Sequence, residues 1–494
     1  MKTQPALVVA AFAFALGCSN HPNGRDQTGS GGHGSGGALG TGGASGGGSS
    51  GGAVGSGGGS ATGGSQTGGA AGAPVGSGGA GGVAGTGATG GAASTASGGA
   101  TASGGATASG GAGAAAGTSG SGGGAGAGGA GGGGALPVLG LNDVTILAPL
   151  PPPGAAPVLL TGTDLADDGS PFLPRALYDR VVTDAVSGKP LPTLDTAYDH
   201  LHLVAVRFDL CDRHLPGPCS ETEDAVLRLV FQPVSTQGNA DDMGFHAFYV
   251  IHKDELAATL GALRALASLN TPVDDVLRVS AALTGPNRDA YAAKVRELVK
   301  RYGGEARLLR LTMNARNLNA SAVVWTLRGI EKKGDAFVDI TIAGSTGSSE
   351  TVTFTGSPGY QVTPSTDTPV GLAGALSQTM FTNADASAKR DYLTALAAVD
   401  NPLTSTADTV PCAACHVATV LMSTRASGAA IDPLALTGRY TSTFNLSIAG
   451  GSSATTPTTI RALGYIATQP MISQRVVNET AQVLAEIEQR FPGP

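Results

Sequence analysis

Apolar and polar residues alternate along several short stretches in the middle of the chain, a period typical of β-strands that bury one face. Gly334 lies in the connection 331–335, where a hairpin turn often needs a positive φ, so the stretches on either side of it are expected to pair. The strands predicted in this way cover 201–208, 226–231, 245–251, 307–313, 323–330 and 337–342.

Other stretches have the three-to-four-residue period of amphipathic helices, as where Leu256, Leu260 and Leu263 share one face. Mostly antiparallel strands interrupted by helices predict an α+β domain over 137–380. A small all-α domain is expected over 381–494. The predicted helices of the two domains cover 254–267, 288–302, 385–399 and 474–490.

Residues 19–136 show neither period, because they are almost all Gly, Ala, Ser and Thr. The hexapeptide Thr-Ala-Ser-Gly-Gly-Ala occurs three times in succession at 95–112. A segment with so little to bury cannot offset the entropy of ordering, so it is predicted to be a disordered linker. The net charge of the chain, −7, is mild and argues against a nucleic-acid partner.

The N-terminus has the layout of an export signal, with Lys2 ahead of an apolar run, 6–16, that is too short to span a bilayer. The residues that end it, Ala15-Leu16-Gly17-Cys18-Ser19, resemble a bacterial lipobox. The resemblance implies a signal peptide over 1–18, a lipid on Cys18 that anchors the chain in the cell envelope, and, from Ser19, the outer membrane. An ordinary secretory signal with an incidental cysteine is the alternative.

Near the C-terminus, Cys412-Ala413-Ala414-Cys415-His416 combines residue types and spacing that specify a chemistry. Two thiols three positions apart can each bond to a vinyl group of one porphyrin, and the adjacent imidazole can bind its iron. The motif resembles the haem-attachment signature of c-type cytochromes. This resemblance implies that 381–494 is a cytochrome c-like domain with one covalent haem c.

Two other interpretations of the motif are a zinc site and a redox pair. A zinc site needs about four clustered ligands, and no Cys or His follows His416 in the chain. A thioredoxin-like redox pair should follow a strand, and residues 401–411 have no strand pattern.

Met471 is the predicted second axial ligand of the iron. It lies in Gln469-Pro470-Met471-Ile472-Ser473, just before the last helix, which resembles the distal-methionine loop of single-haem cytochromes c. Met422 is only six residues after His416 and cannot easily reach the opposite face of a porphyrin. If Met471 only fills the core, the iron would have five ligands or take a histidine from the central domain. By resemblance, Arg461 would pair with a propionate.

The cysteine count supports both motifs. Five cysteines are an odd number for an exported protein, and lipid and haem together account for three. Cys211 and Cys219 flank a Pro-Gly-Pro turn and are predicted to form a disulfide, worth roughly 2.5 to 3 kcal/mol for so small a ring. Alternatively Cys211 could bind a metal with His214. A copper or zinc site could also use the central histidines, which are His200, His202, His246 and His252.

With His416 and Met471 both bound to it, the iron would have no open position, so the expected function is electron transfer rather than catalysis. The central region shows no nucleophile motif and no phosphate-binding glycine loop. The partners would be the membrane, through the lipid, and a redox protein. Two alternatives remain: a surface-displayed binding or scaffolding lipoprotein with a structural or sensory haem, and a haem enzyme with an open distal site. The central domain would dock the partner or shape access to the haem.

Overall fold

The computed structural model describes residues 137–183, 194–213, 216–270, 275–317, 322–345, 347–355, 361–364, 370–448, 460 and 462–492. These residues belong to one compact unit, Ser121–Pro494. The predicted signal peptide, the predicted lipidation site Cys18 and the predicted linker lie outside the described residues, as do His214 and Arg461.

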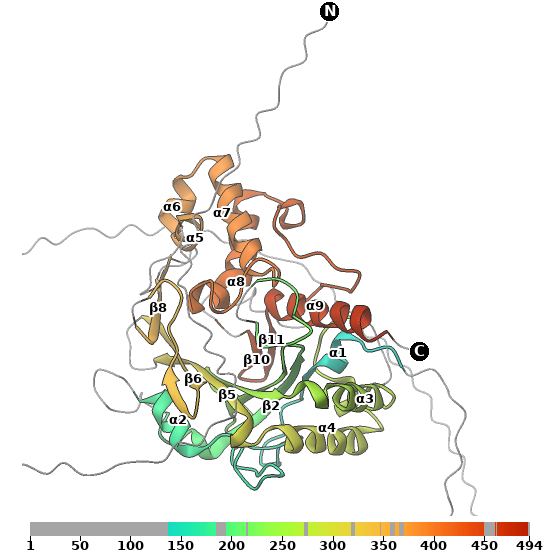
Figure 1. Ribbon diagram of the computed structural model, residues 1–494. Helices are drawn as coiled ribbons and strands as arrows, with labels where there is room; N and C mark the ends of the chain where they lie inside the picture. The colour runs from blue at the N-terminus through green and yellow to red at the C-terminus, as the bar shows by residue number, and fades with distance from the viewer. Residues whose placement is uncertain are drawn as a thin grey trace, which may run out of the picture. The chain divides into compact units, whose positions relative to one another are not determined.

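A large antiparallel sheet is the centre of the structure (Figure 1). Its strands follow chain order along the path β1-β2-β3-β4-β5-β6-β8-β9, and β7 also pairs with β6. Gly334 has a φ of 62° in the turn between β6 and β7, as predicted. The bounds are Thr145–Leu147, Leu201–Asp209, Ala225–Pro233, Met243–Ile251, Leu308–Asn317, Val323–Lys333, Ala336–Asp339, Ser349–Thr355 and Gln361–Pro364 for β1 to β9.

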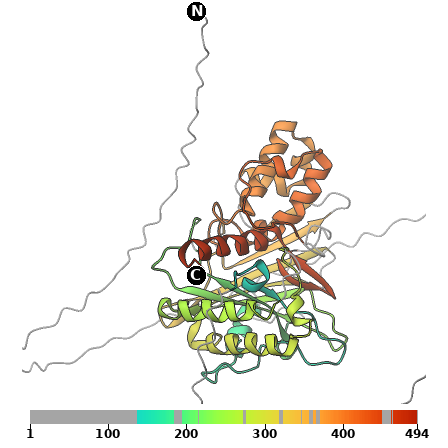
Figure 2. The ribbon, with the colours of Figure 1, turned by 90° about the vertical axis from the view of Figure 1, so that its right-hand side faces the viewer.

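Helices cover both faces of this sheet (Figure 2). On one face lie α2, Arg175–Val182, α3, Leu256–Ala267, and α4, Arg288–Tyr302. On the other face lie α8, Cys412–Ala429, and α9, Gln474–Arg490. This arrangement confirms the predicted mixture of antiparallel strands and helices. The six predicted strands and four predicted helices are all present, with β7 shorter than expected.

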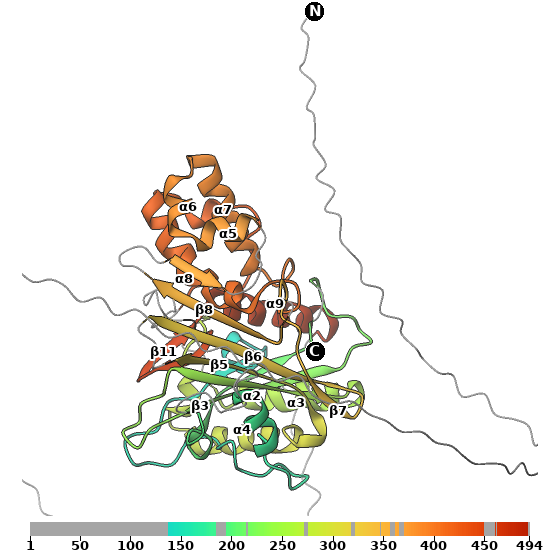
Figure 3. The ribbon, with the colours of Figure 1, turned by 90° about the vertical axis from the view of Figure 1, so that its left-hand side faces the viewer.

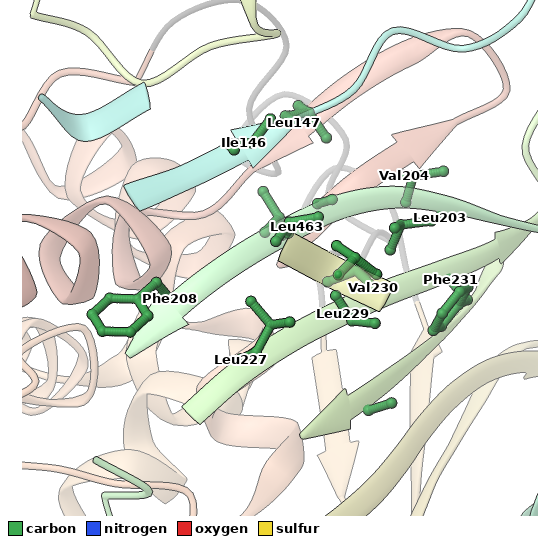
Figure 4. Close-up of a cluster of buried hydrophobic side chains, with 14 of the residues drawn as sticks. Ile146, Leu147, Leu203, Val204, Phe208, Leu227, Leu229, Val230, Phe231 and Leu463 are labelled. Atoms are coloured by element: carbon green, nitrogen blue, oxygen red, sulfur yellow. The ribbon is translucent and has the colours of Figure 1, made fainter. Parts of the chain in front are cut away.

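The first hydrophobic core joins the sheet to helices from both ends of the chain. Leu227, Leu229 and Phe231 of β3 are among its fully buried side chains (Figure 4). Val477 and Leu484 of α9 belong to the same cluster. The last helix of the predicted C-terminal domain therefore shares a core with the central sheet.

The second core lies where the end of the sheet meets the remaining helices (Figure 3). Trp325 of β6 and Phe354 of β8 are buried in it together with Leu396 and Val417. Residues on both sides of the predicted boundary at 380/381 thus pack against one another. The helices of this core are α5, Val370–Leu376, α6, Gln378–Asn383, α7, Ala386–Val399, and α8.

Smaller elements complete the described part of the chain. The hairpin of β10, Leu463–Ile466, and β11, Gln469–Ile472, places Met471 on a strand rather than in a loop. The helix α1, Leu141–Val144, packs beside α9. Short 3-10 helices span Tyr198–His200, Lys253–Glu255, Ala281–Leu283, Glu305–Arg307 and Pro433–Ala435. No helix in the described ranges combines the length and apolar character needed to cross a bilayer.

Asp400, at the end of α7, lies where three helices meet. Its side chain accepts a hydrogen bond of 3.4 Å from Thr419 of α8, and its backbone carbonyl accepts one of 2.7 Å from the Asn478 amide of α9. Arg475 of α9 donates to the carbonyls of Val399 and Ser405, at 2.7 and 2.8 Å. The apolar side chains of α7 and α9 lie in different hydrophobic clusters, and these polar contacts connect the two helices.

Replacing Asp400 with Asn is expected to change how stability depends on pH. Burial raises the pKa of Asp400 to about 7 from an ordinary value of 3.8, although Arg475 opposes the rise. Between about pH 4 and pH 7 the folded state therefore holds a proton that the unfolded state has lost, so stability falls as the pH rises through this window. The difference in the free energy of unfolding between wild type and Asp400→Asn should change by about a few kcal/mol over this pH range.

Urea unfolding of both proteins at intervals between about pH 4 and pH 8 measures this difference. Asp385→Asn, at the exposed start of α7, is the control and should follow the wild-type profile. A constant difference between wild type and Asp400→Asn at every pH would contradict the prediction.

Candidate functional site

The Cys-x-x-Cys-His motif forms the first turns of α8, which begins directly after Pro411. Residues three and four apart lie on one face of a helix, so Cys412, Cys415 and His416 are brought together. The Glu350 carboxylate of β8 accepts a hydrogen bond of 2.9 Å from the Ala413 amide, at the end where helix amides lack partners within the helix. A buried side chain of the sheet therefore holds the start of α8 in place.

All three residues of the motif line one cavity between the start of α8 and the sheet. The sheet contributes His246 and Phe248 of β4, among other side chains, and α9 contributes Arg475 and Glu479. The predicted attachment residues thus face the central domain.

His416 is oriented by a backbone carbonyl. Its Nδ1 lies 2.5 Å from the Ile460 oxygen. A carbonyl can only accept, so Nδ1 carries the proton and the lone pair of the neutral ring is on Nε2. Histidines that bind metals commonly have this second hydrogen bond, which fixes both tautomer and ring orientation.

Cys412 and Cys415 are both half-buried thiols. Burial raises the pKa of Cys412 above its usual range, and the Glu350 charge adds to the rise. Burial likewise raises the pKa of Cys415 to about 11. A catalytic redox pair works through a thiolate with a lowered pKa, so these surroundings do not favour that interpretation.

Three arginines form a row across the sheet beneath the motif. Arg207 of β2 pairs in register with Arg228 of β3, Arg228 with Phe248, and Phe248 with Arg310 of β5. The guanidinium carbons of Arg228 and Arg310 lie 4.6 and 5.8 Å from the centre of the Phe248 ring. This row gives the cavity an apolar ring between two cations.

Each arginine of this row has carboxylate partners. Asp209 and Glu479 both form ion pairs with Arg207, and both lie near Arg228, at 3.3 and 3.9 Å. Glu479 also binds Arg475 at 2.5 Å. Arg310 lies 3.6 to 3.7 Å from three carboxylates, which belong to Asp212, Glu331 and Asp408. The row is therefore a network of paired charges.

Neither methionine that the sequence singles out lines this cavity among the described residues. Met471 is 1% exposed on β11. Met422, on α8, lines a different cavity with Asp400 and Thr419.

The disulfide between Cys211 and Cys219 is present, as predicted. The structure places Glu223 near both sulfurs, and this is the one group of three candidate metal ligands found within the described ranges. The two sulfur atoms are bonded to each other in the disulfide, so this group is not a metal site. His252 pairs with Asp224 at 3.3 Å, outside any such group.

The donor set fits a covalently attached haem, because two thiols and an oriented imidazole face one space. The size of the space limits how much of the group it can enclose. Its volume is about 160 Å³, close to the roughly 150 Å³ of an engineered cavity that binds benzene. The cavity would therefore hold part of a macrocycle rather than all of it.

Comparisons with known proteins give no identification, since no family model, curated protein or solved structure matches the chain. The chemistry of the site must therefore support any functional proposal.

The arginines of the sheet and the α9 residues Arg475 and Glu479 were not among the residues predicted from the sequence. Two spacings could have indicated them. Arg207 and Asp209 are two apart and so share a strand face, and Arg475 and Glu479 are four apart and so share a helix face.

Replacing Glu350 with Gln is expected to lower the pKa of Cys412, because the carboxylate helps to raise it. Gln keeps an oxygen that can accept the Ala413 hydrogen bond. In haem-free protein carrying Cys415→Ala, the rate of Cys412 alkylation at mildly alkaline pH should rise several-fold. The control is Glu488→Gln, at an exposed position of α9. Identical pH profiles with and without Glu350→Gln would show that this charge does not act on the thiol.

Proposed function

We propose that the chain is an electron carrier with one covalently attached haem c. The observation that carries the proposal is that Cys412, Cys415 and His416 line one cavity, with His416 already held through Nδ1. A bound haem would supply a one-electron couple between ferric and ferrous iron. The proposal assigns no catalytic residue, and the chain would act as a carrier rather than an enzyme.

Each residue of the cavity has a separate role in this proposal. Cys412 and Cys415 would hold the group covalently through thioether bonds, and His416 would bind the iron through Nε2. Phe248 offers an apolar surface, and the guanidinium groups of Arg228 and Arg310 lie on either side of its ring.

The proposed cellular location rests on the N-terminal motif. A lipid on Cys18 would anchor the chain in the cell envelope, at the outer membrane, and the segment 19–136 would space the folded unit from the anchor. A redox protein would be the partner, and no nucleic acid would be involved. The disulfide between Cys211 and Cys219 supports an oxidising compartment, where such bonds persist.

The test is a pyridine haemochrome spectrum of the full chain, exported by cells that attach c-type haem. The wild type should give a c-type spectrum that survives acid-acetone extraction, because thioether bonds are not broken by it. Cys412→Ala with Cys415→Ala should lose it. Met422→Leu, on the same helix but lining a different cavity, is the control and should keep the haem.

A reversible one-electron titration of the wild type would then support electron transfer. Colourless wild-type protein, or equal haem in all three proteins, would refute the proposal. Catalytic turnover at an open iron would instead favour the haem enzyme.

A further inference from the structure

We propose that His246, on β4, is the second axial ligand of the haem iron in place of Met471. The inference deepens the proposed function and rests on it. It concerns the position that decides whether the iron is closed to small ligands and how high its reduction potential lies.

His246 faces the cavity because of the alternation along β4. Phe245 and Ala247 on either side of it are fully buried in the first core. Phe245 lies against Tyr178 of α2, with ring centres 4.9 Å apart, so its side chain points toward the face that α2 covers. His246 must then point to the opposite face, where α8 and α9 lie, and it lines the same cavity as His416.

The two histidines approach the cavity from different walls. His416 comes from the first turns of α8, whereas His246 comes from the middle of a sheet strand paired on both sides. In register with His246 are Val230 of β3 and Thr312 of β5, and Thr312 pairs with Gly329. Among these four residues only His246 has a side-chain nitrogen, and the ladder on both sides fixes its backbone. It is therefore preorganised as a ligand.

The methionines are worse placed. Met471 does not line the cavity in the part of the chain that the structure describes. Met313, which does border it, is in register with Phe245 and therefore points to the other face, where it is 3% exposed in the first core. Among the described residues that border the cavity, His246 is thus the best-placed partner for His416.

Two imidazole ligands would leave no open position on the iron. The protein would then resist carbon monoxide, and its reduction potential would be lower than with a methionine ligand. Ligand state and potential can be read independently of any electron-transfer activity.

The experiment uses the full holo-protein in four forms: wild type, His246→Ala, Met471→Leu and His252→Ala. His252 directly follows β4 and is exposed, so it controls for the loss of a histidine. Wild type, Met471→Leu and His252→Ala should stay low-spin, without the far-red band of a methionine–iron bond, and should bind little carbon monoxide. His246→Ala should become high-spin and bind carbon monoxide stoichiometrically.

His246→Met gives a second reading if the alanine variant does not fold. It should stay low-spin, gain the far-red band and have a higher reduction potential than the wild type. The inference is overturned if Met471→Leu opens the iron while His246→Ala does not, or if the wild type already shows the methionine band.

Measuring the haem content of denatured samples distinguishes a failure of this inference from a failure of the proposed function. Wild-type protein without covalent haem refutes both proposals. Full haem content with an unchanged ligand state in His246→Ala refutes only the inference.

Discussion

The Glu479 carboxylate, whose side chain is only 13% exposed, is the contact on which the packing of α9 against the sheet depends. Burial by itself would raise its pKa, but Arg207, Arg475 and Arg228 together hold the pKa well below its ordinary value, so the group stays ionised. It connects β2 and β3 to α9, and Arg475 extends the connection to Val399 and Ser405, ahead of α8. Removing one member of such a network leaves a buried charge without its partner, which costs more than the pair itself contributes.

The same network determines the character of the candidate site. Ion pairs from Glu479 hold α9 against the arginines of the sheet. Arg475 of the same helix binds the loop that leads into Cys412. The motif therefore faces a surface of arginines and carboxylates around Phe248. Glu350 at the start of α8 adds a negative charge beside Cys412, which keeps this thiol protonated. The raised pKa values of Cys412 and Cys415 do not favour thiolate redox chemistry.

The local patterns in the sequence were sufficient for most of the regular elements. The period of apolar residues predicted α4 and α9 with their observed bounds, because each has one continuous buried face. It missed β8 and β9, whose segments are short and rich in Thr and Ser, and the β10–β11 hairpin that holds Met471. Their strand conformation depends on pairing with partners that a local pattern does not contain.

The sequence by itself determined the thiol and imidazole chemistry of Cys412, Cys415 and His416, because neighbours in the chain stay neighbours in any fold. It also indicated the disulfide between Cys211 and Cys219, since a nine-residue segment brings its own ends together. Only the tertiary structure decided what faces the motif. His246 and the arginines of the sheet lie far away in the chain, and they reach the cavity through strand register and through the docking of α8 and α9. Such long-range packing depends on the whole buried interior, which no local spacing records.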